Sequence, residues 1–258
     1  MRLDVFLAEN GYADSRQRAK VLILSECVNV SGKTVTKPSF DVSENDAVTV
    51  TGDPIGYVSR GALKLKAAFE SFGLSALGLV CADIGASTGG FTHYLLEQGA
   101  STVFAIDSGT DQLAKSLRAD TRVVSMEKYN ARNLLPADFE DGVDMAVMDV
   151  SFISQTLIIP SLCKIMKDGA KLVSLIKPQF EAGRSAVGKG GIVKNPASRA
   201  IAIRKVIDCA LENGLSICGL IVSPILGGDG NTEYLAYFVK DGGCLKNENI
   251  DLMISRCV

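Results

Sequence analysis

The spacing of hydrophobic positions divides the 258-residue chain into two parts. Segments 2–8 and 15–25 place apolar residues at helical spacing, and the second begins with a serine suited to cap a helix. Two segments of alternating pattern follow, 27–35 around a Ser-Gly turn and 46–52, and they predict short strands. Together these elements indicate a small α+β domain over residues 1–58.

Strands and helices alternate in the rest of the chain. After a turn expected at Asp53-Pro54, an amphipathic helix ends at Gly73. Strands that are apolar almost throughout are predicted at 79–84, 102–107, 121–126, 143–150 and 171–177, and the helices expected between them include 110–117 and 153–166. Such strands are typical of a parallel sheet with helices on both faces. We therefore expect an α/β domain with a doubly wound Rossmann-like sheet over residues 59–245, mostly parallel with an antiparallel last strand, and a C-terminal tail over 246–258.

Composition and charge narrow the class of protein. The chain is 47% hydrophobic and 22% charged, without a basic and apolar leader or a run of ~18 apolar residues, so we expect a soluble cytoplasmic protein with no membrane partner. Seven scattered cysteines never form a CxxC pair, and no metal site is predicted. The net charge is −2, yet residues 15–37 carry five basic residues against one acidic, and residues 177–205 carry seven against one. These stretches are either phosphate-binding surfaces or solvated helix faces and loops.

A glycine-rich segment, DIGASTGGF from Asp83 to Phe91, joins the first strand of the expected sheet to its first helix. Asp107 ends the next strand, where an acidic residue can accept both ribose hydroxyls of an adenosyl cofactor. Ser87 at the second glycine position weakens a dinucleotide fingerprint, and the lysine of a Walker A loop is absent. The pattern favours S-adenosylmethionine, with these residues at its site: Asp83, Gly85, Ala86, Ser87, Gly89, Gly90, Phe91, Asp107 and Asp149.

The same segment also satisfies G-x-S-x-G, the nucleophile elbow of α/β-hydrolases, with Ser87 as the nucleophile. That fold places its histidine after the serine and the acid. His93 is the sole histidine and lies six residues past Ser87 on the same expected helix. The triad cannot form in its usual order, so the sequence disfavours a hydrolase.

Four charged residues are expected near the cofactor. Asp149 and Lys177 end parallel strands, and Glu233 begins the strand expected to be antiparallel, so the three meet at the edge where such sheets bind ligands. Lys64 lies in the helix before the first strand. A lysine beside a second cation releases its proton more readily, so Lys177 could act as a base on a ribose 2′-hydroxyl with Lys64 nearby, while the two carboxylates orient the amines. A surface ion-pair network explains the same spacing equally well.

Five blocks in order along the chain resemble the TlyA family of FtsJ-type ribose 2′-O-methyltransferases, which act on ribosomal RNA: residues 59–65, 83–91, 149–154, 177–181 and 231–234. The resemblance implies a catalytic set of Lys64, Asp149, Lys177 and Glu233. It also implies S-adenosylmethionine as the cofactor and places Asn130 near the adenine.

Residues 2–4, 15–19 and 28–33 are similar to the alpha-L RNA-binding fold of a ribosomal small-subunit protein. This resemblance implies that the basic helix lies against RNA backbone. A glycine-rich basic loop follows Lys177 and is suited to closing over RNA, although an ordinary flexible loop would look the same. The residues expected to contact RNA are Arg2, Arg16, Arg18, Lys20, Lys33, Arg60, Arg184 and Lys189.

The sequence thus predicts methylation of ribose 2′-hydroxyls in ribosomal RNA, as free RNA or in ribosomal subunits. Two other classes stay open. A non-catalytic RNA-binding or ribosome-assembly factor would not need Lys177. A lytic activity is suggested only because TlyA proteins have carried the name haemolysin, and no long apolar run or strongly amphipathic basic helix supports it. The sequence indicates no oligomeric state.

Overall fold

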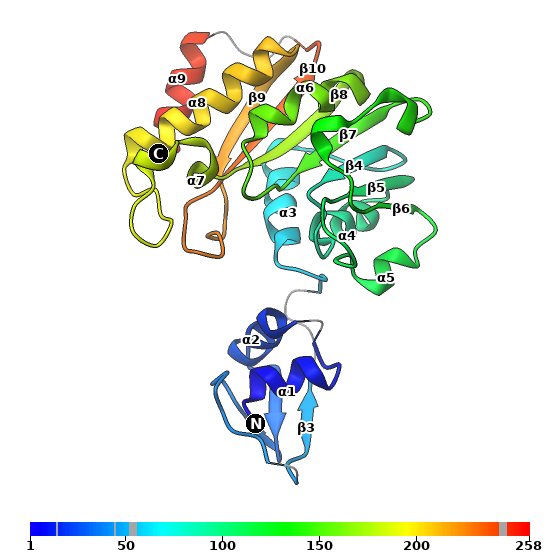
Figure 1. Cartoon of the computed structure of the whole chain (residues 1–258), viewed down its shortest axis with the longest axis vertical. Coiled ribbons are helices and arrows are strands. Elements are labelled where there is room, and N and C mark those ends of the chain that lie inside the picture. The colour runs from blue at the N-terminus through cyan, green and yellow to red at the C-terminus, as the bar shows by residue number, and fades with distance from the viewer. Residues whose placement is uncertain (14, 44, 52–55, 243–246) are drawn as a thin grey trace. The chain divides into compact units, whose positions relative to one another are not determined.

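The computed structural model describes residues 1–13, 15–43, 45–51, 56–242 and 247–258. These residues form two compact units, 1–59 and 60–258 (Figure 1). The turn expected at Asp53-Pro54 and the expected boundary between residues 245 and 246 lie outside the described residues.

The first unit packs two helices against a small sheet. Its elements are α1 (Leu3–Glu9), α2 (Arg16–Leu24), β1 (Val28–Val30), β2 (Lys33–Thr34) and β3 (Val48–Val50). The strands pair antiparallel in the order β2-β1-β3. Ser15 caps α2, because its side chain accepts a hydrogen bond from the backbone N–H of Arg18 at 3.2 Å. Leu3, Leu7, Ile23 and Val28 form the centre of a core that belongs to this unit alone.

The second unit is built on one seven-stranded sheet. Its strands are β4 (Val80–Ile84), β5 (Thr102–Ile106), β6 (Val123–Met126), β7 (Val143–Met148), β8 (Met166–Ile176), β9 (Leu215–Val222) and β10 (Tyr234–Lys240). The order is β6-β5-β4-β7-β8-β10-β9, with β4 to β8 parallel and β10 antiparallel to both of its neighbours. The α/β fold with a mostly parallel sheet and an antiparallel last strand is therefore confirmed.

Helices cover both faces of this sheet, as its nearly apolar strands require. They are α3 (Gly61–Phe72), α4 (Gly90–Glu97), α5 (Lys115–Arg118), α6 (Ile159–Ile165), α7 (Pro178–Glu181), α8 (Pro196–Glu212) and α9 (Asn247–Ser255). Short 3₁₀ turns are η1 (Ala131–Asn133), η2 (Pro136–Asp138), η3 (Gln155–Leu157) and η4 (Arg184–Ala186). Helices α3 and α4 pack together, whereas α8 contacts both α6 and α9 (Figure 1). The last residues are not an isolated tail, since Ile250 and Ile254 of α9 are buried in the core.

Two helices differ from the expectation. The helix expected over 110–117 is only α5, because Ala114 donates its backbone N–H to the Thr88 carbonyl and Asp111 adopts a positive φ of 53°. The helix expected over 153–166 is divided into η3 and α6, and its last residue, Met166, begins β8.

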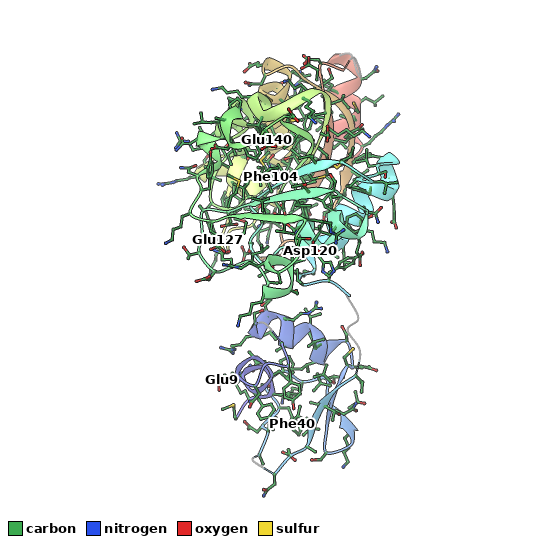
Figure 2. The ribbon with its side chains drawn as sticks, turned by 90° about the vertical axis from the view of Figure 1, so that its right-hand side faces the viewer. Glu9, Phe40, Phe104, Asp120, Glu127 and Glu140 are labelled. Carbon is green, nitrogen blue, oxygen red and sulfur yellow. The ribbon has the colours of Figure 1, made fainter. Side chains whose placement is uncertain are left out.

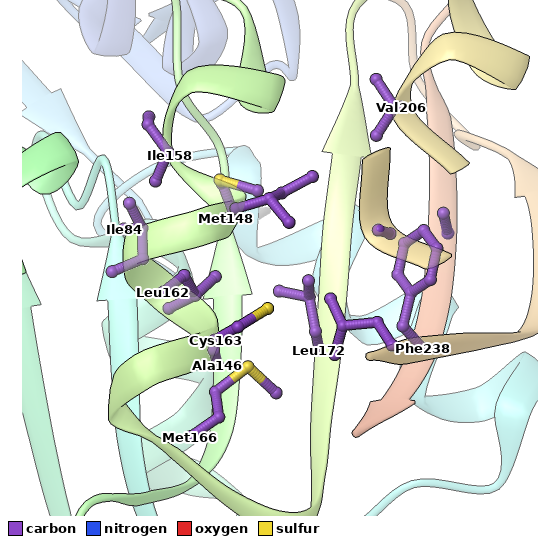
Figure 3. Close-up of a cluster of buried hydrophobic side chains, with 14 of the residues drawn as sticks. Ile84, Ala146, Met148, Ile158, Leu162, Cys163, Met166, Leu172, Val206 and Phe238 are labelled. Carbon is purple, nitrogen blue, oxygen red and sulfur yellow. The ribbon is translucent and has the colours of Figure 1, made fainter. Parts of the chain in front are cut away.

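The main core lies between the sheet and the helices α6 and α8. Met148 and Leu172 come from adjacent parallel strands, and they pack with Leu162 of α6 and Val206 of α8 (Figure 3). Strand β6 is the edge strand at one end of the sheet, far from β8 in the strand order. The surface carboxylates near it are occupied by ion pairs, Asp120 with Arg122 at 2.7 Å and Glu127 with Arg118 at 2.5 Å (Figure 2).

Candidate active site

A pocket of about 380 Å³ opens at the carboxyl ends of β4, β5 and β7. The sheet order reverses direction there, since β4 pairs with β5 on one side and with β7 on the other. Open α/β sheets bind ligands at such a point because the loops on either side diverge. Five of the residues predicted at the cofactor site line this pocket: Gly85, Ser87, Asp107, Asn130 and Asp149.

The loop after β4 is shaped by close backbone contacts. A Cβ atom at Gly85 would lie 2.6 Å from the Asp149 carbonyl oxygen, and φ is +83° there, so only glycine is suited to this position. Ser87 also has a positive φ, 48°, and its N–H donates to Asp107 Oδ2 at 2.8 Å. The other oxygen of Asp107 accepts the Gly109 N–H at 2.7 Å. These bonds fix the Asp107 carboxylate at the wall of the pocket.

The remaining predicted residues of this loop do not line the pocket. Ala86, Gly90 and Phe91 are buried. Asp83 is also buried and accepts hydrogen bonds from the backbone and hydroxyl of Thr92, at 2.9 and 2.7 Å. Burial raises the pKa of Asp83 to about 7. Gly89 has no space for a side chain, since its Cβ would meet Leu117 at 2.3 Å.

Sequence reasoning missed several polar and aromatic residues that line the pocket, namely Ser108, Gln112, Tyr129, Ser151 and Phe152. Most of them follow the ends of β5, β6 or β7 by only a few residues. The signal in the sequence that could have found them is this short separation from a strand end such as the one at Asp107 or Asp149. Asn130 lies at the start of η1, where its side chain accepts the Arg132 N–H at 3.1 Å.

The four charged residues predicted at this edge form two ion pairs. Lys177 Nζ lies 2.6 Å from Asp149 Oδ1 and also donates to Ser151 Oγ at 2.8 Å. Lys64 Nζ lies 2.5 Å from Glu233 Oε2, and both of these side chains are buried. Tyr234 pairs with Ile176 across β10 and β8, so the register places Glu233 beside the end of β8, next to Lys177.

The loop before β10 packs closely around Glu233. A Cβ atom at Gly227 would lie 2.5 Å from Glu233 Oε1. Asn231 is buried, accepts the Val193 N–H at 3.0 Å and donates to the Gly191 carbonyl at 2.9 Å. Asn231 thereby joins the glycine-rich basic loop to the loop that carries Glu233.

An aromatic ring stands at the mouth of the pocket. Phe152 is 92% exposed and has a positive φ of 63°, a conformation that is costly for a bulky residue. Its ring centroid lies 5.3 Å from that of Phe180. Burial does not account for this strained backbone, and the exposed ring lines the pocket.

Comparison with known proteins matches residues 57–240 to the FtsJ-like methyltransferase family and residues 1–48 to the S4 domain. The chain belongs to the FtsJ-like methyltransferases. Among relatives in this family, the 16S/23S rRNA (cytidine-2′-O)-methyltransferase TlyA of Mycobacterium tuberculosis is 44% identical over 92% of this chain and 88% of its own length. Hemolysin A of Brachyspira hyodysenteriae is 45% identical over 93% of this chain and its entire length. A solved structure from Streptococcus thermophilus that carries a hemolysin name is 41% identical, with a TM-score of 0.78 over 99% of this chain and 94% of the other.

The family resemblance seen in the sequence is thus confirmed, including its N-terminal RNA-binding module. Within the part of the chain that the structure describes, no helix is long and apolar enough to cross a membrane. The described residues also contain no cluster of three or more histidine, cysteine or acidic side chains able to hold a metal ion.

The residues predicted to contact RNA occur in both units of this methyltransferase. Arg2, Arg16, Arg18, Lys20 and Lys33 belong to the S4 unit, and Arg60, Arg184 and Lys189 belong to the larger unit. In the S4 unit the buried Asp4 carboxylate accepts Arg2 Nε at 2.9 Å and Arg16 Nη2 at 3.1 Å. The hydrogen bond from Arg2 holds the pKa of Asp4 down at about 2. Both guanidinium groups are therefore held in place while remaining about half exposed.

Proposed function

We propose that this methyltransferase transfers a methyl group from S-adenosylmethionine to ribose 2′-hydroxyls of ribosomal RNA. The observation that carries the proposal is the Lys177–Asp149 ion pair, because Asp149 lines the same pocket as the Asp107 carboxylate. The relative from M. tuberculosis is named for the same reaction on rRNA.

The pocket residues fit an adenosyl ligand. Asp107 presents a carboxylate suited to the ribose hydroxyls, and Gly85 leaves bare backbone beside Asp149. Ile106 and Ile158 offer apolar surface near Asn130, which suits an adenine ring with one polar edge. The cofactor supplies an electrophilic methyl group on a sulfonium centre.

The ion pairs supply the proton chemistry. In its free-amine form, Lys177 Nζ would accept the proton of the 2′-hydroxyl, and the oxygen would use the electron pair of the O–H bond to bind the methyl carbon. The bond from that carbon to the sulfonium sulfur would break, and its electron pair would stay on the sulfur. Asp149 and Ser151 hold this amine in place, at 2.6 and 2.8 Å. Lys64, held by Glu233, stabilises the negative charge that develops on the oxygen.

Substrate binding uses both units. Arg2 and Arg16 present guanidinium groups to phosphates from the S4 unit. The exposed ring of Phe152 offers a stacking face to a base beside the reacting ribose. The basic loop with Arg184 and Lys189 is exposed and adds phosphate contacts. A substrate of ribosomal RNA also implies a cytoplasmic location.

The test is transfer of radiolabelled methyl from S-adenosylmethionine to unmodified ribosomal subunits and to free rRNA. Wild-type protein labels ribose, Lys177→Ala loses at least about 100-fold in rate, and Asp107→Ala loses cofactor binding. Lys164→Ala, which alters an exposed lysine of α6, is the matched control and keeps full activity. A wild-type protein that binds cofactor but labels no RNA contradicts the substrate, and full activity of Lys177→Ala contradicts the base.

A further inference from the structure

The segments that carry Asp149 and Lys177 are joined by a second set of contacts behind the ion pair. Glu181 ends α7, four residues after Lys177, and its side chain is 1% exposed. One carboxylate oxygen accepts the Gln155 N–H at 2.8 Å, and the other accepts the Ser154 hydroxyl at 2.5 Å. Ser154 and Gln155 close the loop that begins at Asp149, so Glu181 ties this loop to α7.

A second set of hydrogen bonds joins the same loop to β8, at residues that precede Lys177. The buried Gln155 side chain donates to the Leu175 carbonyl at 2.6 Å and accepts the Ser174 hydroxyl at 2.6 Å. Leu175 lies two residues before Lys177 in β8. The loop that begins with Asp149 is therefore held to the chain on both sides of Lys177, through Gln155 before it and through Glu181 after it.

Lys205 of α8 also contacts Glu181 and Ser154. Its Nζ lies 3.6 Å from Glu181 Oε2 and donates to the Glu181 carbonyl at 3.2 Å and to Ser154 Oγ at 3.4 Å. Glu181 does not line the pocket. It is therefore placed to act on the reacting groups only through the two segments that it joins.

A buried carboxylate is a costly way to join two segments. Burial raises the pKa of Glu181 above its ordinary value even though two hydrogen-bond donors and one lysine surround it. A carboxylate has one advantage over a neutral side chain, since both of its oxygens accept hydrogen bonds and can hold two donors in fixed directions. Gln155 and Ser154 supply these donors.

We propose that Glu181 is a positioning residue for the Lys177–Asp149 pair, which it aligns by fixing the loop after β7 to α7. The inference rests on the proposed role of Lys177 as the base. Base catalysis is sensitive to such alignment, because a displacement of about 1 Å can cost on the order of 100-fold in rate.

The experiment measures kcat, KM for S-adenosylmethionine, KM for ribosomal subunits and Tm for Glu181→Gln in the full chain. The expected result is a fall in kcat between about 10-fold and 100-fold, with both KM values unchanged. Asp144→Asn is the matched control, since Asp144 also accepts a backbone N–H, from Val80 at 2.9 Å, and a lysine, Lys167 at 2.8 Å, but lies at the opposite end of β7. It lowers Tm and leaves kcat unchanged.

Ser154→Ala removes only one of the two hydrogen-bond donors to Glu181, the Ser154 hydroxyl. This variant replaces Glu181→Gln in the test if Glu181→Gln fails to fold. It lowers kcat severalfold in the same direction. Unchanged kcat in Glu181→Gln, or in Ser154→Ala if only that variant folds, overturns the inference, as does an equal loss in Asp144→Asn. Lys177→Ala in the same assay tests the proposed function separately. If this variant kept full activity, Lys177 would not be the base, whereas Glu181→Gln and Ser154→Ala test only how the base is aligned.

Discussion

At the scale of single residues, Gly227 controls the position of Glu233. A methyl group at this position would lie 2.5 Å from Glu233 Oε1, which is too close for both groups to stay in place. The carboxylate is the group that moves, because it is the end of a flexible side chain. We expect Gly227→Ala to lower kcat by about 10-fold or more through the Lys64–Glu233 pair, and to lower Tm as well because this pair is buried. Gly228→Ala is the matched control, since its nearest neighbour is Arg60 at 3.9 Å. Equal kcat values for the two variants would contradict a role for Glu233.

Asp83 gives a prediction about pH. Its folded-state pKa is raised to about 7 by burial, so the folded protein keeps a proton that the unfolded chain releases near pH 4. The free energy of unfolding should therefore fall as pH rises from about 4 to about 7, by on the order of a few kcal/mol, and then level off. Asp83→Asn cannot ionise and lacks this decline. Urea unfolding of both proteins at pH 5 and pH 8 measures the difference, and parallel pH dependences would show that Asp83 is ionised in the folded protein.

The site residues that could be predicted share one property. Asp107, Asp149 and Lys177 stand at strand ends, and the periodicity of a buried strand locates its end well. Asn231 and Glu181 could not be found in this way, because their partners lie 26 to 40 residues away in sequence and are brought near only by packing.

At the scale of elements, the glycine-rich basic loop depends on Asn231. Both polar atoms of this buried side chain bind backbone of the loop, at Val193 and Gly191. We expect Asn231→Ala to release the loop and raise KM for ribosomal subunits severalfold, without changing the Kd of S-adenosylmethionine. Asn195→Ala removes a comparable bond, the 2.9 Å cap of α8, and should leave KM unaltered. If the loop makes no contact with RNA, the two variants will have the same KM.

Element boundaries were predicted unevenly. Gly73 ends α3 with a left-handed φ of 61°, as the sequence indicated. The split between η3 and α6 cannot be seen in the sequence, because the apolar pattern of 153–166 continues through it. In the structure, the side chain of Gln155 in η3 is bound to β8.

At the scale of the whole molecule, each unit has its own hydrophobic core, so RNA affinity and chemistry can be altered separately. We expect Arg16→Gln to raise KM for ribosomal subunits and to reduce the slope of log K against log salt by about 0.7 to 0.9, with kcat at saturation unchanged. Arg256→Gln, an exposed arginine of the larger unit, is the control. A fall in kcat without a change in the salt slope would contradict a phosphate contact.

The position of β10 has a consequence for how the chain is made. This strand is the last of the sheet in sequence, yet it lies between β8 and β9. During synthesis the edge of β8 stays unpaired until residue 240 has left the ribosome, and an open edge of this kind invites pairing with other chains. Glu233 arrives with the same strand. A nascent chain can therefore complete its cofactor pocket, which needs only β4 to β7 and their loops, well before its two ion pairs exist together.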